Sequence, residues 1–167
     1  MNRRNLMTAI AGTAAMSLVP GIAAAQIRAA AGAVDEAKMP ALMGGDFSTA
    51  TSKLAKRRAS NPAVREFADL EITEQAAVAK AFGAKPGEAG VRPDQAAMLE
   101  KLEAASGAEF DMMYIDGQIM GHRELLDIHR RYSRNGSDPM ARGASLVGVT
   151  GIETHLFLLE NLKRQIA

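Results

Sequence analysis

The stretch that decides the fold reads SGAEFDMMYIDGQIMGHRELLDIHRRYSRN and runs from Ser106 to Asn135. No proline interrupts these 30 residues, and at roughly 1.5 Å per residue they predict a helical rod of about 45 Å. Ser106 and Glu109 have the spacing of a capping box at its start. Asn135 and Gly136 form a stop signal, because glycine accepts the left-handed backbone that ends many helices. We therefore expect this segment to be the longest helix of the molecule.

One stripe of this helix is apolar or small, and a polar line borders it. With about 100° between successive residues, the stripe contains Phe110, Tyr114, Gly117, Gly121, Leu125, Ile128 and Tyr132. The bordering line contains Gln118, His122, Leu126 and His129. Polar side chains are therefore expected at the edge of the face that the helix buries.

Four further helices are expected along the chain. Ala, Leu and Met dominate the apolar residues, aromatic residues make up 4% and Trp is absent, which favours helices over strands. Suitable N-caps or first residues are Asp46, Asn61, Pro62, Pro93, Asp138 and Pro139. They predict helices over 47–59, 62–82, 93–105 and 139–165. No stretch alternates with a period of two, so we expect no strand and an all-α, up-and-down bundle of four main helices and one short one.

The first 25 residues have the pattern of a secretion signal. Arg3 and Arg4 give a positive start, and residues 6–19 form an uncharged run that is too short to span a bilayer easily. A short run of alanines supplies a cleavage site before Gln26. The arginine pair followed by x-Leu-Met resembles a twin-arginine export signal, and an ordinary Sec leader with two arginines is the alternative.

Cleavage would leave an Ala-rich lead-in over 26–43 and a helical bundle domain over 44–167, and we expect this mature chain in the periplasm. Removing Arg3 and Arg4 from the 20 basic residues leaves 18 against 19 acidic residues, a net charge of −1. That charge gives no electrostatic case for a nucleic-acid partner. Cysteine is absent, which excludes disulfides and thiolate metal sites. No transmembrane segment is expected in the mature chain.

Three helices each place a polar side chain within or beside an apolar stripe. Glu71 and Gln75 fall in the middle of the buried face of the second helix, and Glu74 lies at its edge. His122 borders the stripe of the longest helix. His155 lies near the middle of the stripe of the last helix. A carboxylate in such a position is costly unless it is protonated, paired or bound to a metal.

Two imidazoles and one carboxylate suit a divalent first-row metal ion such as iron, zinc, manganese or copper. We therefore predict that Glu71, His122 and His155 converge inside the bundle, with ligand atoms within about 4–5 Å of one another, and bind one such ion. Alternate ligands, or side chains that orient an imidazole, are Glu74, Gln75 and Gln118. The alternative is a buried hydrogen-bond network of the same side chains without a metal.

The methionines of the longest helix and His129 are not expected to bind the metal ion. Helical geometry turns Met113 and Met120 away from His122, so these methionines and Met112 are expected to fill the core and not to bind copper(I). His129 lies one heptad beyond His122, about 10 Å along the rod. We expect it to cap a neighbouring helix or to face water.

Four segments resemble an exported bacterial family of unknown function, DUF4142. They are KLAxxxASNPxVxxFA from Lys53, SGAxFDxxY from Ser106, Gly121-His122, and Thr154-His155-Leu156. The resemblance covers about residues 44–165. Members are assigned a ferritin-like helical bundle and are often labelled outer membrane proteins. The resemblance therefore implies fold and compartment, and no particular activity.

The chain departs from this family's pattern at two positions. Members commonly have Asp-His where this chain has Glu74-Gln75, and a Glu near Ser48 in the first helix. These departures remove one histidine and one carboxylate, whereas a di-iron site needs about four carboxylates and two histidines. A dinuclear oxidase or ferroxidase is therefore not expected, although Glu71 could substitute for a missing acid.

The residues and the resemblance together predict a ferritin-like, up-and-down four-helix bundle with one short extra helix. The leading interpretation is a non-catalytic periplasmic protein that binds one divalent metal ion. A metal-dependent oxidoreductase or iron-handling protein is the first alternative, and a structural or protein-binding envelope component is the second. Expected partners are a second copy of the chain or an envelope protein. The sequence shows no Ser-His-Asp order, phosphate loop or nucleotide fingerprint.

Overall fold

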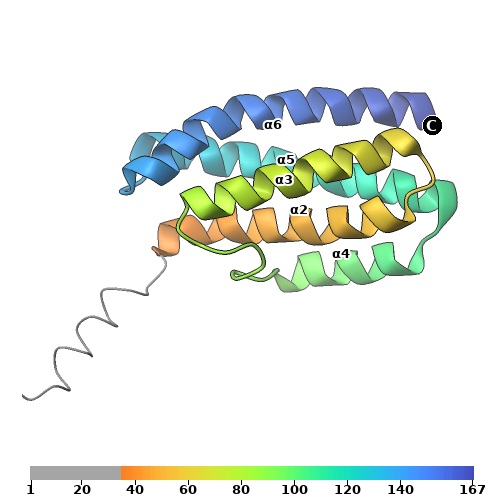
Figure 1. Cartoon of the computed structure of the whole chain (residues 1–167), viewed down its shortest axis with the longest axis horizontal. Helices are drawn as coiled ribbons and strands as arrows, with labels where there is room; N and C mark the ends of the chain where they lie inside the picture. The colour runs from red at the N-terminus through yellow and green to blue at the C-terminus, as the bar shows by residue number, and fades with distance from the viewer. Residues whose placement is uncertain (1–34) are drawn as a thin grey trace, which may run out of the picture. The chain divides into compact units, whose positions relative to one another are not determined.

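The computed structural model describes residues 35–167, within one compact unit that begins at Val34. It consists of the short 3-10 helix η1 (Glu36–Lys38) and the α-helices α2 (Met39–Arg58), α3 (Pro62–Ala81), α4 (Pro93–Ala104), α5 (Gly107–Asn135) and α6 (Pro139–Ile166) (Figure 1). No strand occurs in these residues, so the prediction of an all-helical protein is confirmed for them. The predicted signal over 1–25 and the first half of the predicted lead-in over 26–43, residues 26–34, lie outside the described residues.

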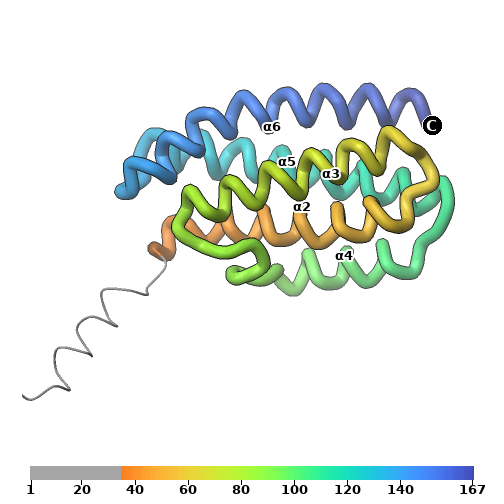
Figure 2. Tube along the Cα trace, viewed as in Figure 1, coloured from red at the N-terminus to blue at the C-terminus, as the bar shows by residue number. Residues whose placement is uncertain are grey.

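The four long helices pack side by side in neighbouring pairs, α2 with α3, α5 with α6, α2 with α5, and α3 with α6. The α3–α6 pair has the least extensive contact of the four. Helix α4 lies against α2 and α5 and carries the chain back along the bundle (Figure 2). As a result α3 and α5 run in the same direction (Figure 1). The predicted up-and-down order therefore holds only when α4 is counted.

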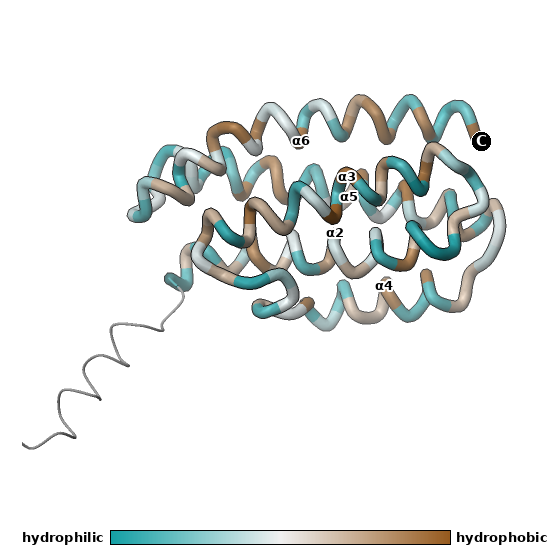
Figure 3. The backbone as a smooth tube through the Cα atoms, viewed as in Figure 1, coloured by the Kyte–Doolittle hydropathy of each residue, from teal (hydrophilic) through white to brown (hydrophobic). Residues whose placement is uncertain are grey.

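The interior contains two apolar clusters, one towards each end of the bundle. One cluster includes Phe67 of α3, Tyr114 of α5 and Leu159 of α6, and the other includes Phe82, Leu125 and Ile152. Figure 3 shows apolar and polar residues alternating along each helix, as expected when one face is buried and the other is exposed. In the described part of the chain, no helix is both long enough and apolar enough to span a membrane.

Helix α2 begins earlier than the sequence predicted. It runs through Gly44 and Gly45, which were expected to precede the helix, and Asp46 lies inside it instead of capping it. A Cβ atom on Gly44 would lie 2.7 Å from the Leu125 Cδ2, and one on Gly45 would lie 2.6 Å from the Gln75 Oε1. The two glycines therefore permit close helix packing and do not break the helix.

Asp46 instead holds the loop between α3 and α4. Its buried carboxylate accepts hydrogen bonds from the backbone N–H groups of Gly87 at 2.5 Å and of Ala89 and Gly90 at 2.9 Å each. The loop that follows α3 is thus fixed to the body of the bundle, which orients α4 against α2 and α5.

The end signals of the helices are confirmed in some places and wrong in others. The Asn61 side chain accepts from the Ala63 N–H at 2.8 Å, and Asp138 caps α6 in the same way. Ser106 occupies the N-cap of α5 but makes no capping bond, so the predicted capping box is absent. Gly136 has a φ of −63°, outside the left-handed region. A Cβ there would lie 2.3 Å from the Tyr132 ring, so the glycine is needed for space and not for its backbone freedom.

Candidate metal centre

Three helices place Glu71, His122 and His155 at one point in the interior of the bundle. Glu71 comes from α3, His122 from α5 and His155 from α6, and the side chains are 0%, 1% and 8% exposed. Each residue is held there because it shares a helical face with apolar residues that pack into the core. Glu71, for example, lies one turn beyond Phe67 and Ala68, which are both buried.

The three ligand atoms form a nearly equilateral triangle. The Glu71 Oε2 lies 3.3 Å from the His122 Nε2 and 3.0 Å from the His155 Nδ1, and the two nitrogens are 3.2 Å apart. One ligand atom of each residue lies within 4.8 Å of the others, so the predicted convergence is confirmed.

One oxygen of the Glu71 carboxylate accepts hydrogen bonds, and the other accepts none. Its Oε1 accepts from the Ser48 hydroxyl at 2.6 Å and from the Gln75 amide at 2.9 Å. Its Oε2, at the corner of the triangle, is buried and makes no hydrogen bond. A buried acceptor without a donor is costly, so this atom calls for a positively charged partner.

Each imidazole has a second partner on the side away from the triangle. The His122 Nδ1 lies 2.8 Å from the backbone carbonyl oxygen of Gln118, which can only accept, so this nitrogen carries the proton. The His122 Nε2 then presents a lone pair to the triangle. The His155 Nε2 lies 3.3 Å from a Glu74 oxygen, which favours the tautomer that also frees the Nδ1. Fixing an imidazole through its far nitrogen is usual at metal sites.

The pKa of the Glu71 carboxyl reflects two opposing effects. Burial raises it, but the imidazoles of His122 and His155 and the Ser48 hydroxyl outweigh burial, and the pKa lies well below its usual range. Burial lowers the pKa of His155, and the carboxylates of Glu71 and Glu74 more than compensate, so that this pKa is raised. The carboxylate therefore faces the imidazoles in its charged form, which metal binding requires.

The geometry fits a metal ion bound by three ligands. Ligands at 2.0–2.2 Å from an ion lie about 3.4 Å apart in a tetrahedron and about 3.0 Å apart on one face of an octahedron. The measured edges of 3.0 Å, 3.2 Å and 3.3 Å fall within that interval. An ion slightly out of the plane of the triangle could therefore contact all three atoms without movement of the backbone.

A second polar group, not predicted from the sequence, supports the centre from α2. Ser48, where family members commonly have Glu, donates to the Glu71 Oε1 or to the Gln118 Oε1, which are 2.6 Å and 2.8 Å away. Gln118 in turn donates to the Thr51 hydroxyl at 2.8 Å. The sequence pointed to position 48 only because family members commonly have Glu there. That departure indicated the loss of a carboxylate and did not indicate a hydrogen bond from Ser48 to Glu71.

Two of the three remaining candidate residues, Gln75 and Gln118, make contacts different from those expected. Gln75 contacts the Glu71 carboxylate and not an imidazole, and the Gln118 side chain bonds hydroxyl groups while only its backbone holds His122. The expectation that either amide orients an imidazole is therefore wrong. Glu74 is the residue whose side chain contacts an imidazole.

Two predictions outside the triad also fail. His129 neither caps a helix nor faces water: it is buried, with its Nδ1 3.0 Å from the Ser145 hydroxyl and its ring edge-on to Phe82. Met120 is 57% exposed and so does not fill the core. Met113 is partly buried and packs against the apolar cluster that contains Phe67 and Tyr114. His129 lies on the line that borders the buried stripe, and the helical wheel alone does not show how far a neighbouring helix covers that line. Met120 lies outside the stripe, which agrees with its exposure.

Comparison with known proteins gives one result. The model of a family described as a domain of unknown function (DUF4142) matches residues 20–162, a range that contains all three residues of the triad. No curated protein matches the chain, and no solved structure does. The match covers most of the chain and confirms the resemblance drawn from its motifs. The chain belongs to the DUF4142 family.

Proposed function

We propose that this protein binds one divalent first-row metal ion through Glu71, His122 and His155, and that it does so without catalysing a reaction. The observation that carries the proposal is the buried Glu71 Oε2, which makes no hydrogen bond and lies 3.0 Å and 3.3 Å from two imidazole nitrogens. A cation among these atoms would pair with this acceptor, a role that a protonated His155 imidazole would fill in a metal-free centre. The set of two nitrogens and one oxygen suits zinc, iron(II), manganese or copper.

The expected consequence of binding is stability. The three ligands come from α3, α5 and α6, so the ion would join helices that are far apart in the sequence. An ion that binds only the folded state raises the free energy of unfolding by mass action. The near-complete burial of Glu71 and His122 keeps these two ligands away from solvent, which supports a non-catalytic role.

The test is thermal unfolding with and without zinc, manganese(II), copper(II) and iron(II). At a free concentration of about 100 Kd, the preferred ion should raise the Tm of the parent protein by about 10 °C. His122→Ala should abolish the increase. His129→Ala is the matched control, because it removes a buried histidine outside the triad and should retain the increase. An increase of equal size in both variants would contradict the proposal.

A metal-dependent oxidoreductase is the second candidate. It is favoured by one observation, that three ligands from the described residues 35–167 meet at the centre, which leaves a coordination position for a small molecule. Two histidines and one carboxylate with open positions are typical of mononuclear iron(II) oxygenases. Turnover of peroxide or iron(II) by the metal-loaded protein that is lost in His122→Ala would favour this candidate over a purely structural ion.

We further propose a ferritin-like fold and a periplasmic location. The ferritin-like fold is supported by two helix pairs joined through a crossing connection, with Glu and His facing inward. The location rests on the signal pattern that includes Arg3 and Arg4. An envelope partner is supported by the exposed apolar residues of α6, which are Met140, Leu146, Val147, Phe157 and Leu158.

A further inference from the structure

The three residues of the triad differ in their access to solvent. Glu71 and His122 are 0% and 1% exposed, and His155 alone reaches the surface, with 8% of its area exposed. An ion that arrives from solvent therefore meets the His155 imidazole before it meets the other two residues. The far nitrogen of that ring faces Glu74, whose side chain is 34% exposed.

This exposed edge of the centre lies in a groove between α3 and α6. The groove has a volume of about 730 Å³ and is lined mainly by small or apolar residues, together with Glu74 and His155. Its floor on α6 includes Gly148 and Gly151. Among the residues that line the groove, Glu74 is the only carboxylate, so it is the one group there that attracts a cation by charge.

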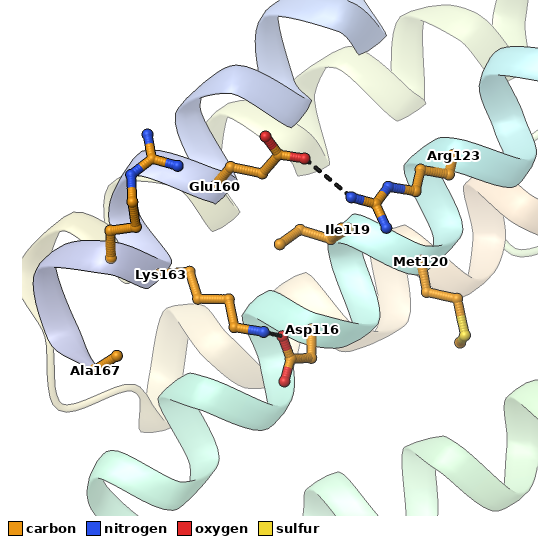
Figure 4. A pocket seen from close by; sticks show the side chains of 8 residues that line it. Asp116, Ile119, Met120, Arg123, Glu160, Lys163 and Ala167 are labelled. Carbon is orange, nitrogen blue, oxygen red and sulfur yellow. Dashed lines mark hydrogen bonds and ion pairs between the residues drawn. The ribbon is translucent and has the colours of Figure 1, made fainter.

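On its other side, α6 is joined to α5 by ion pairs. There Asp116 and Arg123 of α5 form ion pairs with Lys163 and Glu160 of α6 across a second pocket (Figure 4). Between α3 and α6, by contrast, the ion pairs within residues 35–167 are those that His155 makes with Glu71 and Glu74. The α3–α6 side is therefore both the less closely packed one and the one at which the triad approaches solvent.

Gly151 makes room for the Glu74 carboxylate between the two helices. A Cβ at position 151 would lie 3.0 Å from the Glu74 Oε1 and 3.8 Å from its Oε2. A Cβ there would require the end of the Glu74 side chain to shift by a few tenths of an ångström. The glycine thus lets the Glu74 carboxylate approach the backbone of α6 closely.

We propose that Glu74 is the uptake ligand of the metal centre: it binds the incoming ion at the α3–α6 groove and passes it across His155 to Glu71. The inference rests on the proposed metal binding. The Glu74 Oε2 and the Glu71 Oε2 lie on opposite sides of the same imidazole, 3.3 Å and 3.0 Å from its two nitrogens. Rotation of the His155 side chain would move the ion from the outer carboxylate to the inner one.

A role limited to orienting His155 makes a different prediction. An orienting residue stabilises the final complex, and its loss typically weakens metal affinity by about 10–100-fold, mainly through faster dissociation. An uptake ligand is not bound to the ion in the final complex, so its loss slows association and dissociation by the same factor. Glu74→Gln separates the two roles, because the amide oxygen can still accept from the His155 N–H while the charge is removed.

The experiment measures zinc transfer from a fluorescent zinc indicator to the metal-free protein by stopped flow, with the reverse rate measured by a chelator. In Glu74→Gln both rate constants should fall together by about tenfold, as expected when a steering charge is removed. Glu66→Gln removes an exposed charge from α3 outside the groove and should leave both rates unchanged.

Two results would overturn the inference while the proposed function stands. The first is zinc uptake by Glu74→Gln within about twofold of the parent rate, with zinc still bound at equilibrium. The second is unchanged association with faster dissociation, which assigns Glu74 an orienting role only. If the parent protein takes up no zinc at equilibrium, both the inference and the proposed function are wrong.

Discussion

At the scale of single residues, two buried histidines have opposite electrostatic environments. His155 lies between the carboxylates of Glu71 and Glu74, and its pKa is raised despite burial. His129 faces only the Ser145 hydroxyl and the Phe82 ring, and burial lowers its pKa to about 4. The same side chain is therefore suited to a charged or metal-binding centre in one place and to a neutral core position in the other.

His129 makes the stability of the protein dependent on pH. Its pKa is about 4 in the folded state and 6.5 in the unfolded state, so between these values the unfolded chain binds more protons and stability falls as the pH falls. The expected loss between pH 7 and pH 4 is about 3 kcal/mol. Urea unfolding at both pH values should show this loss in the parent and a smaller one in His129→Gln. Equal losses in both proteins would show that His129 does not remain neutral.

At the scale of helices, the sequence predicted helix ends correctly where the interaction that sets the end lies within one helix. Asn61 and Asp138 cap the helices they were expected to cap, because a cap depends on residues two or three positions away. The predicted helix began only after Gly44 and Gly45, because the effect of these glycines depends on Leu125 and Gln75 of other helices. Helical periodicity does not show which neighbour a small residue accommodates.

Leu159 tests the assignment of the buried face of α6. It is 0% exposed and packs in the same cluster as Phe67 and Tyr114. Leu159→Ala should lower the free energy of unfolding by about 2–5 kcal/mol, through lost burial and the cavity that remains. Its neighbour Leu158 is 43% exposed, and Leu158→Ala should change stability by less than about 0.5 kcal/mol. Chemical unfolding that gives similar costs for the two variants would show that α6 is rotated in its packing.

At the scale of the whole molecule, the candidate centre could be predicted because each of its residues lies within or beside the apolar stripe of its own helix. Glu71, His122 and His155 come from three helices, and the bundle brings their ligand atoms within 4.8 Å. The contribution of Ser48 could not be predicted, and Glu74 was named only as one of three candidates, because both contacts depend on how closely α2 and α6 approach α3. The route to the centre likewise depends on the spacing of helices and not on any one motif.

Export is the second property that belongs to the whole chain. If the twin-arginine route is used, replacing Arg3 and Arg4 by lysine should retain the precursor in the cytoplasm, because the receptor requires the arginine pair and not charge alone. Fractionation of cells that express the two forms would measure this. Normal export of the double variant would favour the Sec route.

The central claim, a metal ion bound by the triad, is tested most directly by equilibrium dialysis of the purified protein against zinc, followed by metal analysis. The account predicts one zinc per chain in the parent and in His129→Ala, and loss of that zinc in Glu71→Gln and His122→Ala, because each removes one of the three ligands that residues 35–167 supply. The absence of zinc from the parent, or the same zinc content in His122→Ala as in the parent, would contradict it.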